Sequence, residues 1–355
     1  MARTPRGEVF DEDTVGCYHC INRCVRRAFL CGQDPVSGKS YEHRKAWIRD
    51  RLEQLAAIFA IDVLDYAVLS NHFHVILRNR PDIVEQWSDV EVARRWWNLF
   101  PQRKDENGEA EEPQDHELQM LIADREQFEE IRRRLSHISW FMRCLAEDIA
   151  RRSNREDQVS GRFFQGRFRC QKLLDESALL ACSIYVDLNP VRAGVARTPE
   201  TSRYTSAYDR IRGRKHSRDK KRRRKGTKPP RRRDGKSPDR WLSPVPLSTR
   251  ASCKERVAGR ASNKGFLPVG LDEYLQLLDW TGRQVSGNKR GSIPQHLAPI
   301  LTRLQIASES WTEMVSNFGR WFSNAAGRAD SLTAEATRRG RRGVQGVGVS
   351  RTAFV

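Results

Sequence analysis

Two apolar runs separated by only two residues set the strongest constraint on how this 355-residue chain can fold. The runs are "DVLDYAVL" (62–69) and "HFHVIL" (72–77), and Ser70 and Asn71 lie between them. A two-residue connection between runs of this length is typical of a tight antiparallel hairpin. The sequence therefore predicts a β-hairpin here, within a larger sheet.

Five further segments follow strand or helix periodicity. Residues 14–25 are rich in β-branched and aromatic residues, as strands are, and the end of residues 161–175 is predicted to form a further strand. Residues 41–60, 131–155 and 176–189 predict helices: the first two carry an amphipathic apolar stripe, and the third stops at a proline. The resulting order, βαββαβα, predicts an α+β fold. We expect a ferredoxin-like, four- to five-stranded antiparallel sheet with helices packed against it.

Composition divides the chain into unequal parts. We expect a polar N-terminal tail (1–14), a main domain (15–210) with an acidic insertion (about 81–130), a basic disordered linker (211–264), a small helical accessory module (265–325) and a flexible Gly- and Arg-rich tail (326–355). The insertion is recognised by its charge, because residues 103–130 hold 11 acidic and 3 basic residues.

The positive charge is concentrated in one run. The net charge is +19, and residues 212–233 contribute 14 Lys or Arg against one Asp, whereas residues 1–211 sum to −2. A polyanionic partner is expected for such a run, with affinity that falls steeply as salt rises. We therefore predict DNA contacts at Arg222, Arg223 and Arg224, although a solvated tether would have the same composition.

Location and redox state follow from features that the sequence lacks. It has neither an apolar stretch long enough to span a membrane nor a secretory signal, which predicts a cytoplasmic, nucleoid-associated protein. Its 8 cysteines lack the regular pairing of a secreted disulfide framework and are expected to be reduced. Cys17 and Cys20 suggest zinc by spacing, but on a strand they point to opposite faces.

The two histidines of the hairpin are candidates for a metal site. Alternate residues of a strand share a face, so His72 and His74 lie side by side while Phe73 turns into the core. Two imidazoles so placed can bind one metal ion. The alternative is a polar sheet face. A binuclear zinc hydrolase is disfavoured, because "VILRNR" after the pair supplies none of the further ligands.

A later helix offers groups that complete the site. Tyr185 and Asn189 are spaced i, i+4, so a phenol and an amide oxygen share one helix face. A mixed nitrogen and oxygen ligand set with open positions suits Mg²⁺ or Mn²⁺ that also binds a substrate phosphate. Taken alone, Tyr185 would also fit a packing role.

Four segments in order resemble a known family. "NHFHVIL" (71–77), "GRFFQGRFR" (161–169), "YVDLNPVRAG" (185–194) and "RYTSAY" (203–208) are similar to the single-tyrosine HUH transposases, and most to the bacterial REP-associated tyrosine transposases. The resemblance covers residues 15 to about 210. It implies an HUH nuclease fold and a metal-dependent transposase of a mobile element that cleaves and rejoins single-stranded or hairpin DNA.

The resemblance also implies roles for individual residues. His72 and His74 match the metal-binding pair, Tyr185 matches the nucleophile that forms a 5′-phosphotyrosine, and Asn189 matches the third, amide-bearing ligand. The family includes dimers and monomers, so a homodimer is possible. The acidic insertion lengthens the separation of His74 from Tyr185 beyond the usual pattern.

A basic and aromatic loop precedes the last strand. Its phenylalanines alternate with arginines, an arrangement that can stack bases and neutralise phosphates, although at least two of the phenylalanines would also suit the core. The predicted DNA contacts in and after this loop are Arg162, Phe164, Arg167, Arg169 and Arg192.

Two other functions remain open at the level of sequence. One is a domesticated DNA-binding protein that keeps the fold without turnover, which has no need for a metal and nucleophile set. The other is a replication-initiator or relaxase-like HUH nickase. Such enzymes often use paired tyrosines and a three-histidine site, whereas the residues close to Tyr185 in sequence include Ile184 and Asp187 rather than a second tyrosine.

Overall fold

The computed structural model describes residues 6–25, 30–34, 38–106, 108, 110–224, 236–247, 259–286, 301, 304 and 306–354. The chain forms an α+β fold around one five-stranded sheet of order β2-β3-β1-β4-β5. The strands are β1 (Cys17–Arg23), β2 (Ile61–Val68), β3 (His72–Asn79), β4 (Arg169–Leu173) and β5 (Ala325–Ala326). No helix of the described residues is long and apolar enough to cross a membrane.

The predicted hairpin is confirmed, but the sheet is mixed rather than purely antiparallel. The β2–β3 turn closes at Ser70 and Asn71, where the backbone N–H of Leu69 donates to the carbonyl of His72 at 2.9 Å. β1 pairs antiparallel with β3 and β4, whereas β5 pairs parallel with β4. This correction arises because β5 lies far beyond the predicted domain and returns to the sheet edge from the C-terminal region.

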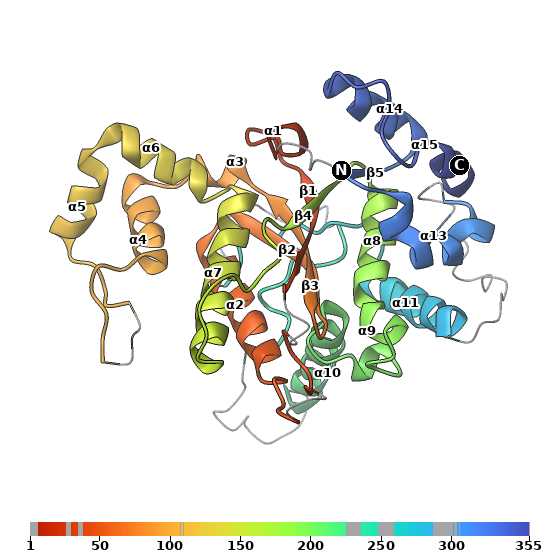
Figure 1. The fold of residues 1–355 in the computed structure, drawn as a ribbon, viewed down its shortest axis with the longest axis horizontal. Coiled ribbons are helices and arrows are strands. Elements are labelled where there is room, and N and C mark those ends of the chain that lie inside the picture. The colour runs from red at the N-terminus through yellow and green to blue at the C-terminus, as the bar shows by residue number, and fades with distance from the viewer. Residues whose placement is uncertain are drawn as a thin grey trace.

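Helices cover both faces of the sheet (Figure 1). The helices α2 (Arg44–Ile58) and α7 (Ile138–Glu156) pack on one face, where Phe73, Val75 and Leu77 join a large apolar core. The helix α8 (Glu176–Asp187) packs on the other face with Ile76 and Leu173. The alternation of β3 thus separates two cores and assigns the histidines to the α8 side.

The acidic insertion is more helical than its composition suggests. Residues 101–106 and 110–114 belong to no helix, but α3 (Pro81–Val84), α4 (Asp89–Leu99), α5 (Asp115–Ala123) and α6 (Arg125–Arg134) lie on either side of them in the chain. These helices form a lobe beside α7 (Figure 1), and Trp97 and Phe128 are buried within it.

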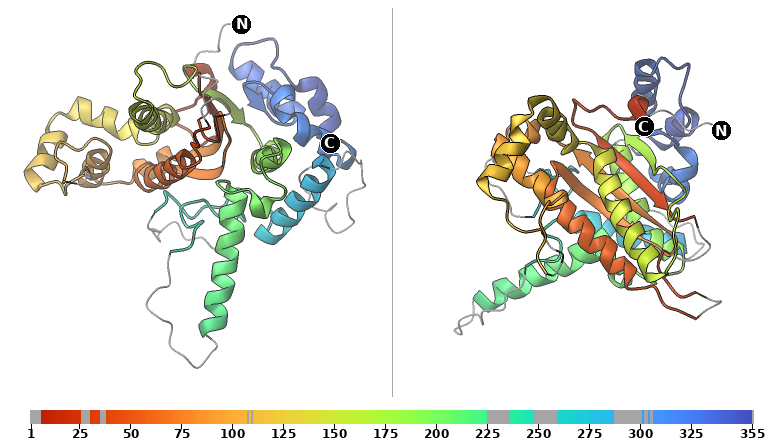
Figure 2. Two further views of the ribbon diagram at one scale, coloured as in Figure 1. Left: turned by 60° about the horizontal axis from the view of Figure 1, so that its bottom comes forward. Right: turned by 60° about the vertical axis from the view of Figure 1, so that its left-hand side comes forward.

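The basic segment is not uniformly disordered, contrary to the prediction. The helix α10 (Ser206–Arg224) runs through the first part of the basic run and projects from the body (Figure 2). It is anchored by its first residues: Ser206 donates to Asp187 at 2.5 Å, Tyr66 donates to Asp209 at 2.9 Å, and Arg210 pairs with Asp65. These polar contacts replace the apolar side chains that the sequence lacks here.

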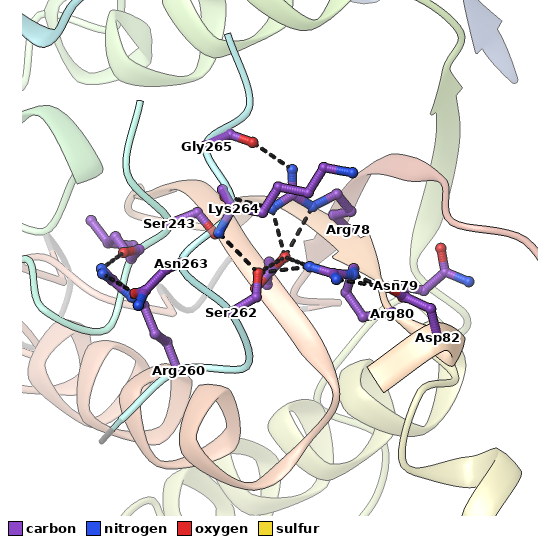
Figure 3. Close-up of polar contacts among 12 residues, drawn as sticks. Arg78, Asn79, Arg80, Asp82, Ser243, Arg260, Ser262, Asn263, Lys264 and Gly265 are labelled. Carbon is purple, nitrogen blue, oxygen red and sulfur yellow. Dashed lines mark hydrogen bonds and ion pairs between the residues drawn. The ribbon is translucent and has the colours of Figure 1, made fainter. Parts of the chain in front are cut away.

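Residues 236–247 and 259–267 also pack on the body rather than forming a loose linker. Leu242 bridges Val63 of the edge strand β2 in parallel, and the N–H of Ser243 donates to the Val63 carbonyl at 2.9 Å. Ser262 donates to buried Asp62 at 2.8 Å and accepts from Arg80 at 2.7 Å. Arg78 reaches the Gly265 carbonyl at 2.8 Å (Figure 3).

Both ends of the described part of the chain pack on the body as well. Phe10, after α1 (Arg6–Val9), is buried against Tyr18 with ring centroids 5.1 Å apart. The expected flexible tail instead forms α14 (Ala329–Arg338) and α15 (Val347–Ala353), fixed by buried Leu332 and Phe354. The tail has few apolar residues, but they are enough to fix its helices because they pack into one apolar cluster.

The expected accessory module packs directly on the sheet domain. α11 (Leu271–Ser286) and α13 (Ser308–Trp321) share the apolar core of α8. Tyr274 of α11 donates to Asp187 at 2.7 Å, and Ser177 of α8 donates to the Leu304 carbonyl at 2.5 Å. The C-terminal region therefore packs against α8.

Candidate functional site

The two hairpin histidines lie side by side on the α8 face, as predicted. Their ring centroids are 4.9 Å apart, while Phe73 points to the opposite core and contacts Phe164. His72 is half-buried, and its Nδ1 lies 2.6 Å from Oδ1 of Asn71. Because an amide oxygen only accepts, Nδ1 of His72 carries the proton and Nε2 keeps its lone pair.

A third histidine, which the sequence analysis did not single out, joins the pair. His19 of β1 places Nε2 2.9 Å from Nδ1 of His74, and their rings stack with centroids 5.1 Å apart. In the β1–β3 register Ile21 lies opposite His74, so His19 is its diagonal neighbour. The signal that would have found it is strand pairing, because His19 and His74 are 55 residues apart.

Burial keeps all three imidazoles neutral. It lowers the pKa of His19 and of His72 to about 4, and that of His74 well below its ordinary value. The positive charge of a nearby arginine adds to this effect at each of them. A neutral imidazole has the lone pair that metal binding requires, so the cluster suits a metal at neutral pH.

Tyr185 and Asn189 meet the same cluster from the helical side. The helix α8 begins at Glu176, where Asp175 accepts from the N–H of Ala178 at 2.9 Å, and ends at Asp187. The short helix α9 (Asn189–Arg192) follows, so the predicted continuous helix is broken at Leu188. Even so, Nδ2 of Asn189 lies 3.2 Å from Nε2 of His74.

The Tyr185 ring lies among the histidines and a cation. Its centroid is 5.7 Å from that of His74 and 6.0 Å from that of His19, both edge to face. The Arg192 guanidinium lies 5.1 Å from the ring, and Arg192 also donates to the carbonyl of Ser316. The side chain is half-buried and lines a cleft, which gives the phenol access to a substrate.

The spacing of two donor atoms fits a hard divalent ion, but few side chains of the usual metal-ligating types are available. Two ligands on one ion at about 2.1 Å, at right angles, lie about 3 Å apart. The Asn189–His74 separation of 3.2 Å matches such a pair, and a flip of the amide would present its oxygen. Among the described residues no three His, Cys, Asp or Glu side chains form a metal-binding group. A third protein ligand would have to be of another type, and the amide of Asn189 lies at hydrogen-bonding distance from His74.

A cleft of about 930 Å³ opens beside Tyr185, between the sheet and α13. Among the described residues that line it there is no Asp or Glu, although the chain has 45 of them. Its charged and polar lining includes four arginines. These are Arg167, Arg169, Arg192 and Arg320, and they are accompanied by His19, Gln171, Asn317 and Asn324. Such a lining suits an anionic, extended ligand.

The predicted DNA contacts divide into four groups. Arg167, Arg169 and Arg192 line the cleft, and Arg162 is exposed but is not part of the lining. Phe164 is 7 % exposed and packs against Phe73, so its predicted stacking role is wrong. It is held there because Cys24 bridges Phe164 at the end of β1. The side chains of Arg222, Arg223 and Arg224 lie outside the described residues.

Helix α13, in the C-terminal region, contributes part of the site that the sequence analysis did not assign. The rings of Phe318 and Tyr185 have centroids 5.8 Å apart. A Cβ at Gly319 would lie 3.2 Å from the Tyr185 hydroxyl oxygen, so the phenol occupies space that a larger residue would fill. Arg320 then follows on the cleft wall.

Comparisons with known proteins give little independent identification. No family model matches the chain, and no curated protein matches it. A solved structure of a REP-associated tyrosine transposase bound to a REP hairpin is similar over 56 % of this chain and 81 % of that chain, with 12 % identity and a TM-score of 0.32. A similarity of this size does not establish a shared family.

Proposed function

We propose that the protein is a metal-dependent tyrosine transposase that cleaves and rejoins single-stranded or hairpin DNA. The observation that carries the proposal is the position of Tyr185. Its ring contacts His19 and His74, one of which lies 3.2 Å from Asn189, at a cleft lined by four arginines and no carboxylate of the described residues. A phenol, ligands for a hard cation and an anion-binding surface are what phosphodiester cleavage by tyrosine requires.

In the proposed reaction Tyr185 is the nucleophile. Its Oη forms a bond to phosphorus while the bond from phosphorus to the 3′ oxygen of the upstream strand breaks. The phenol loses its proton and the departing oxygen gains one, which leaves a 5′-phosphotyrosine and a free 3′-hydroxyl. Arg192, whose guanidinium lies 5.1 Å from the centroid of the Tyr185 ring, would contact the phosphate under attack. Attack by another 3′-hydroxyl reverses the step and rejoins DNA.

Mg²⁺ or Mn²⁺ would be held by His72, His74 and the Asn189 amide oxygen. When bound, the ion would draw charge from a non-bridging phosphate oxygen and stabilise the transition state. Arg167 and Arg169 would contact the flanking phosphates. Because the histidines, Tyr185 and Asn189 belong to one chain, we expect cleavage without a homodimer.

The projecting helix α10 would bind the duplex stem of a hairpin. Nine of residues 212–224 are Lys or Arg, and a single Asp opposes them. A helix fits the major groove of B-DNA, and the 13 residues span about 20 Å at 1.5 Å per residue. This contact would be independent of sequence, and Arg222, Arg223 and Arg224 would contribute to it near the end of the helix.

A relaxase-like nickase with three histidine ligands is less well supported. His19 is close enough to suggest such a site, but its Nε2 faces Nδ1 of His74 at 2.9 Å rather than sharing an open position with it. A binder without turnover would leave Tyr185, His72 and Asn189 without a common role.

The proposal is tested with purified protein and hairpins from the DNA that flanks its gene. Strands labelled at either end are incubated with Mn²⁺ or with EDTA, and Tyr185→Phe is compared with Tyr208→Phe as the matched control. We expect wild type and Tyr208→Phe to form a metal-dependent adduct with the downstream fragment that is stable in SDS. Tyr185→Phe should form none. Hairpin binding without an adduct under every metal condition would favour the binding protein instead.

A further inference from the structure

A chain of four polar side chains crosses the sheet beneath the candidate metal site. Asn189, His74, His19 and Gln171 come from α9, β3, β1 and β4, which are neighbours in space but distant in sequence. His74 and His19 are each 2 % exposed, and Gln171 is 5 % exposed. Buried polar atoms have to find partners within the protein, so the hydrogen bonds in this chain are interdependent.

The direction of every hydrogen bond in this chain of side chains follows from Asn189, the first of its four residues. With the Asn189 amide oriented as in this structure, its Nδ2 atom donates and Nε2 of His74, 3.2 Å away, accepts. A neutral imidazole carries a single proton, which therefore resides on Nδ1 of His74. That proton is donated to Nε2 of His19 at 2.9 Å.

The same reasoning extends one residue further. Because Nε2 of His19 accepts, its proton is on Nδ1, and the side chain of His19 is hydrogen-bonded to that of Gln171. The register supports this contact, since His19 and Gln171 lie directly opposite each other on β1 and β4. The Gln171 amide oxygen is the acceptor that ends the chain.

We infer that His19 is a positioning residue: it holds His74 in the tautomer whose Nε2 lone pair points to the metal site. Both ring nitrogens of His19 are engaged, by His74 and by Gln171, so His19 is not itself a ligand. Metal entry would replace the Asn189 N–H at Nε2 and would leave every other hydrogen bond of the chain unchanged. The site is thereby organised before the metal arrives. Partners of this kind typically affect metal affinity by 10- to 100-fold.

The inference rests on the proposed metal site, but its first test needs neither metal nor DNA. Long-range ¹H–¹⁵N correlation spectra of protein labelled at histidine distinguish Nδ1–H from Nε2–H imidazoles. We expect Nδ1–H for His74 in the metal-free protein, with His74→Gln used to assign its signals. An Nε2–H tautomer at His74 would overturn the inference.

The second test measures Mn²⁺ affinity by electron paramagnetic resonance. His19→Leu removes the acceptor for His74, whereas His19→Gln retains an oxygen that can accept the same proton. We expect binding 10- to 100-fold weaker for His19→Leu, and affinity within about 3-fold of wild type for His19→Gln. Thermal unfolding of both variants shows whether they remain folded.

The outcomes separate the inference from the proposed function. If wild type binds Mn²⁺ and His19→Leu binds it equally well, the positioning role is wrong and the metal site stands. If wild type binds no Mn²⁺, the metal-dependent function fails, and the His74 tautomer in the wild type and in His19→Leu still decides whether His19 fixes it. Rescue by His19→Gln would distinguish the hydrogen bond from packing.

Discussion

Tyr274 donates a hydrogen bond of 2.7 Å to Asp187, which lies two residues after Tyr185 on the same helix. Ser206 donates to the other carboxylate oxygen at 2.5 Å. Asp187 thus joins α8 to α11 and α10, the helix of the C-terminal region and the basic helix. The orientation of Tyr185 therefore depends on segments that the sequence suggested were peripheral.

The buried Asp187 predicts a pH dependence of stability. Burial, aided by the charge of Asp65, raises the pKa of Asp187 to about 7, whereas an unfolded aspartate titrates near 3.9. The folded protein thus retains a proton that the unfolded chain loses, so this contribution favours folding at low pH and is lost as pH rises from about 4 to 7. Denaturant unfolding of wild type and Asp187→Asn at each pH isolates it. We expect their free-energy difference to change by at most about 1.4 kcal/mol per pH unit, and parallel curves would contradict the assignment.

Gly319 predicts a variant in which activity and stability move in opposite directions. In Gly319→Ala the new Cβ lies 3.2 Å from the Tyr185 hydroxyl and displaces it by a few tenths of an ångström. We expect adduct formation to slow by about 10-fold, because displacement of a nucleophile by 1 Å can cost about 100-fold. Alanine raises helix propensity by about 1 kcal/mol, so the melting temperature should not fall. Gly343→Ala, where the new Cβ has open space, is the control, and equal rates for both variants would refute the steric argument.

Phe164 and Arg169 predict separable effects on folding and binding. Phe164→Ala removes a buried ring from the core and should lower the free energy of unfolding by about 3–5 kcal/mol. Arg169→Ala, exposed on the cleft wall, should leave stability within about 0.5 kcal/mol but weaken binding of single-stranded DNA. Chemical denaturation and fluorescence anisotropy measure the two quantities. A stable Phe164→Ala that loses DNA affinity would restore the stacking role.

The basic helix predicts a change in the salt dependence of hairpin binding. Replacing Arg222, Arg223 and Arg224 together by glutamine removes three charges while keeping good helix formers. The slope of log affinity against log salt should decrease by at most about 3, since each phosphate contact contributes about 0.9. The corresponding lysine variant keeps the charges and should retain the slope. An unchanged slope for the glutamine variant would show that these arginines do not touch DNA.

The sequence predicted the parts of the site that depend on local periodicity. Alternation along β3 was enough to place His72 beside His74, and helical spacing brought Tyr185 and Asn189 to the same cluster. His19 could not be found in this way, because its contact with His74 depends on the register between strands.

The errors have physical causes of their own. Phe164 lies in a loop that looked basic and exposed, but a bridge to Cys24 turns its ring into the core. The basic run was expected to be disordered because it has few apolar residues. Its helix is instead anchored by ion pairs and hydrogen bonds such as Arg210–Asp65 and Tyr66–Asp209, which hydropathy does not register.

The packing of residues 242–243 against β2 has a consequence for solubility. β2 is an edge strand, and an uncovered edge offers unpaired N–H and C=O groups to a second molecule. Leu242 and Ser243 occupy part of that edge at Val63, and Thr205 bridges it at Ala67. If many copies of a polycationic protein bound one polyanion, their local concentration would be high, and uncovered strand edges could pair between copies. The packing of residues 242–243 on β2 would therefore reduce association of copies of the chain through this edge.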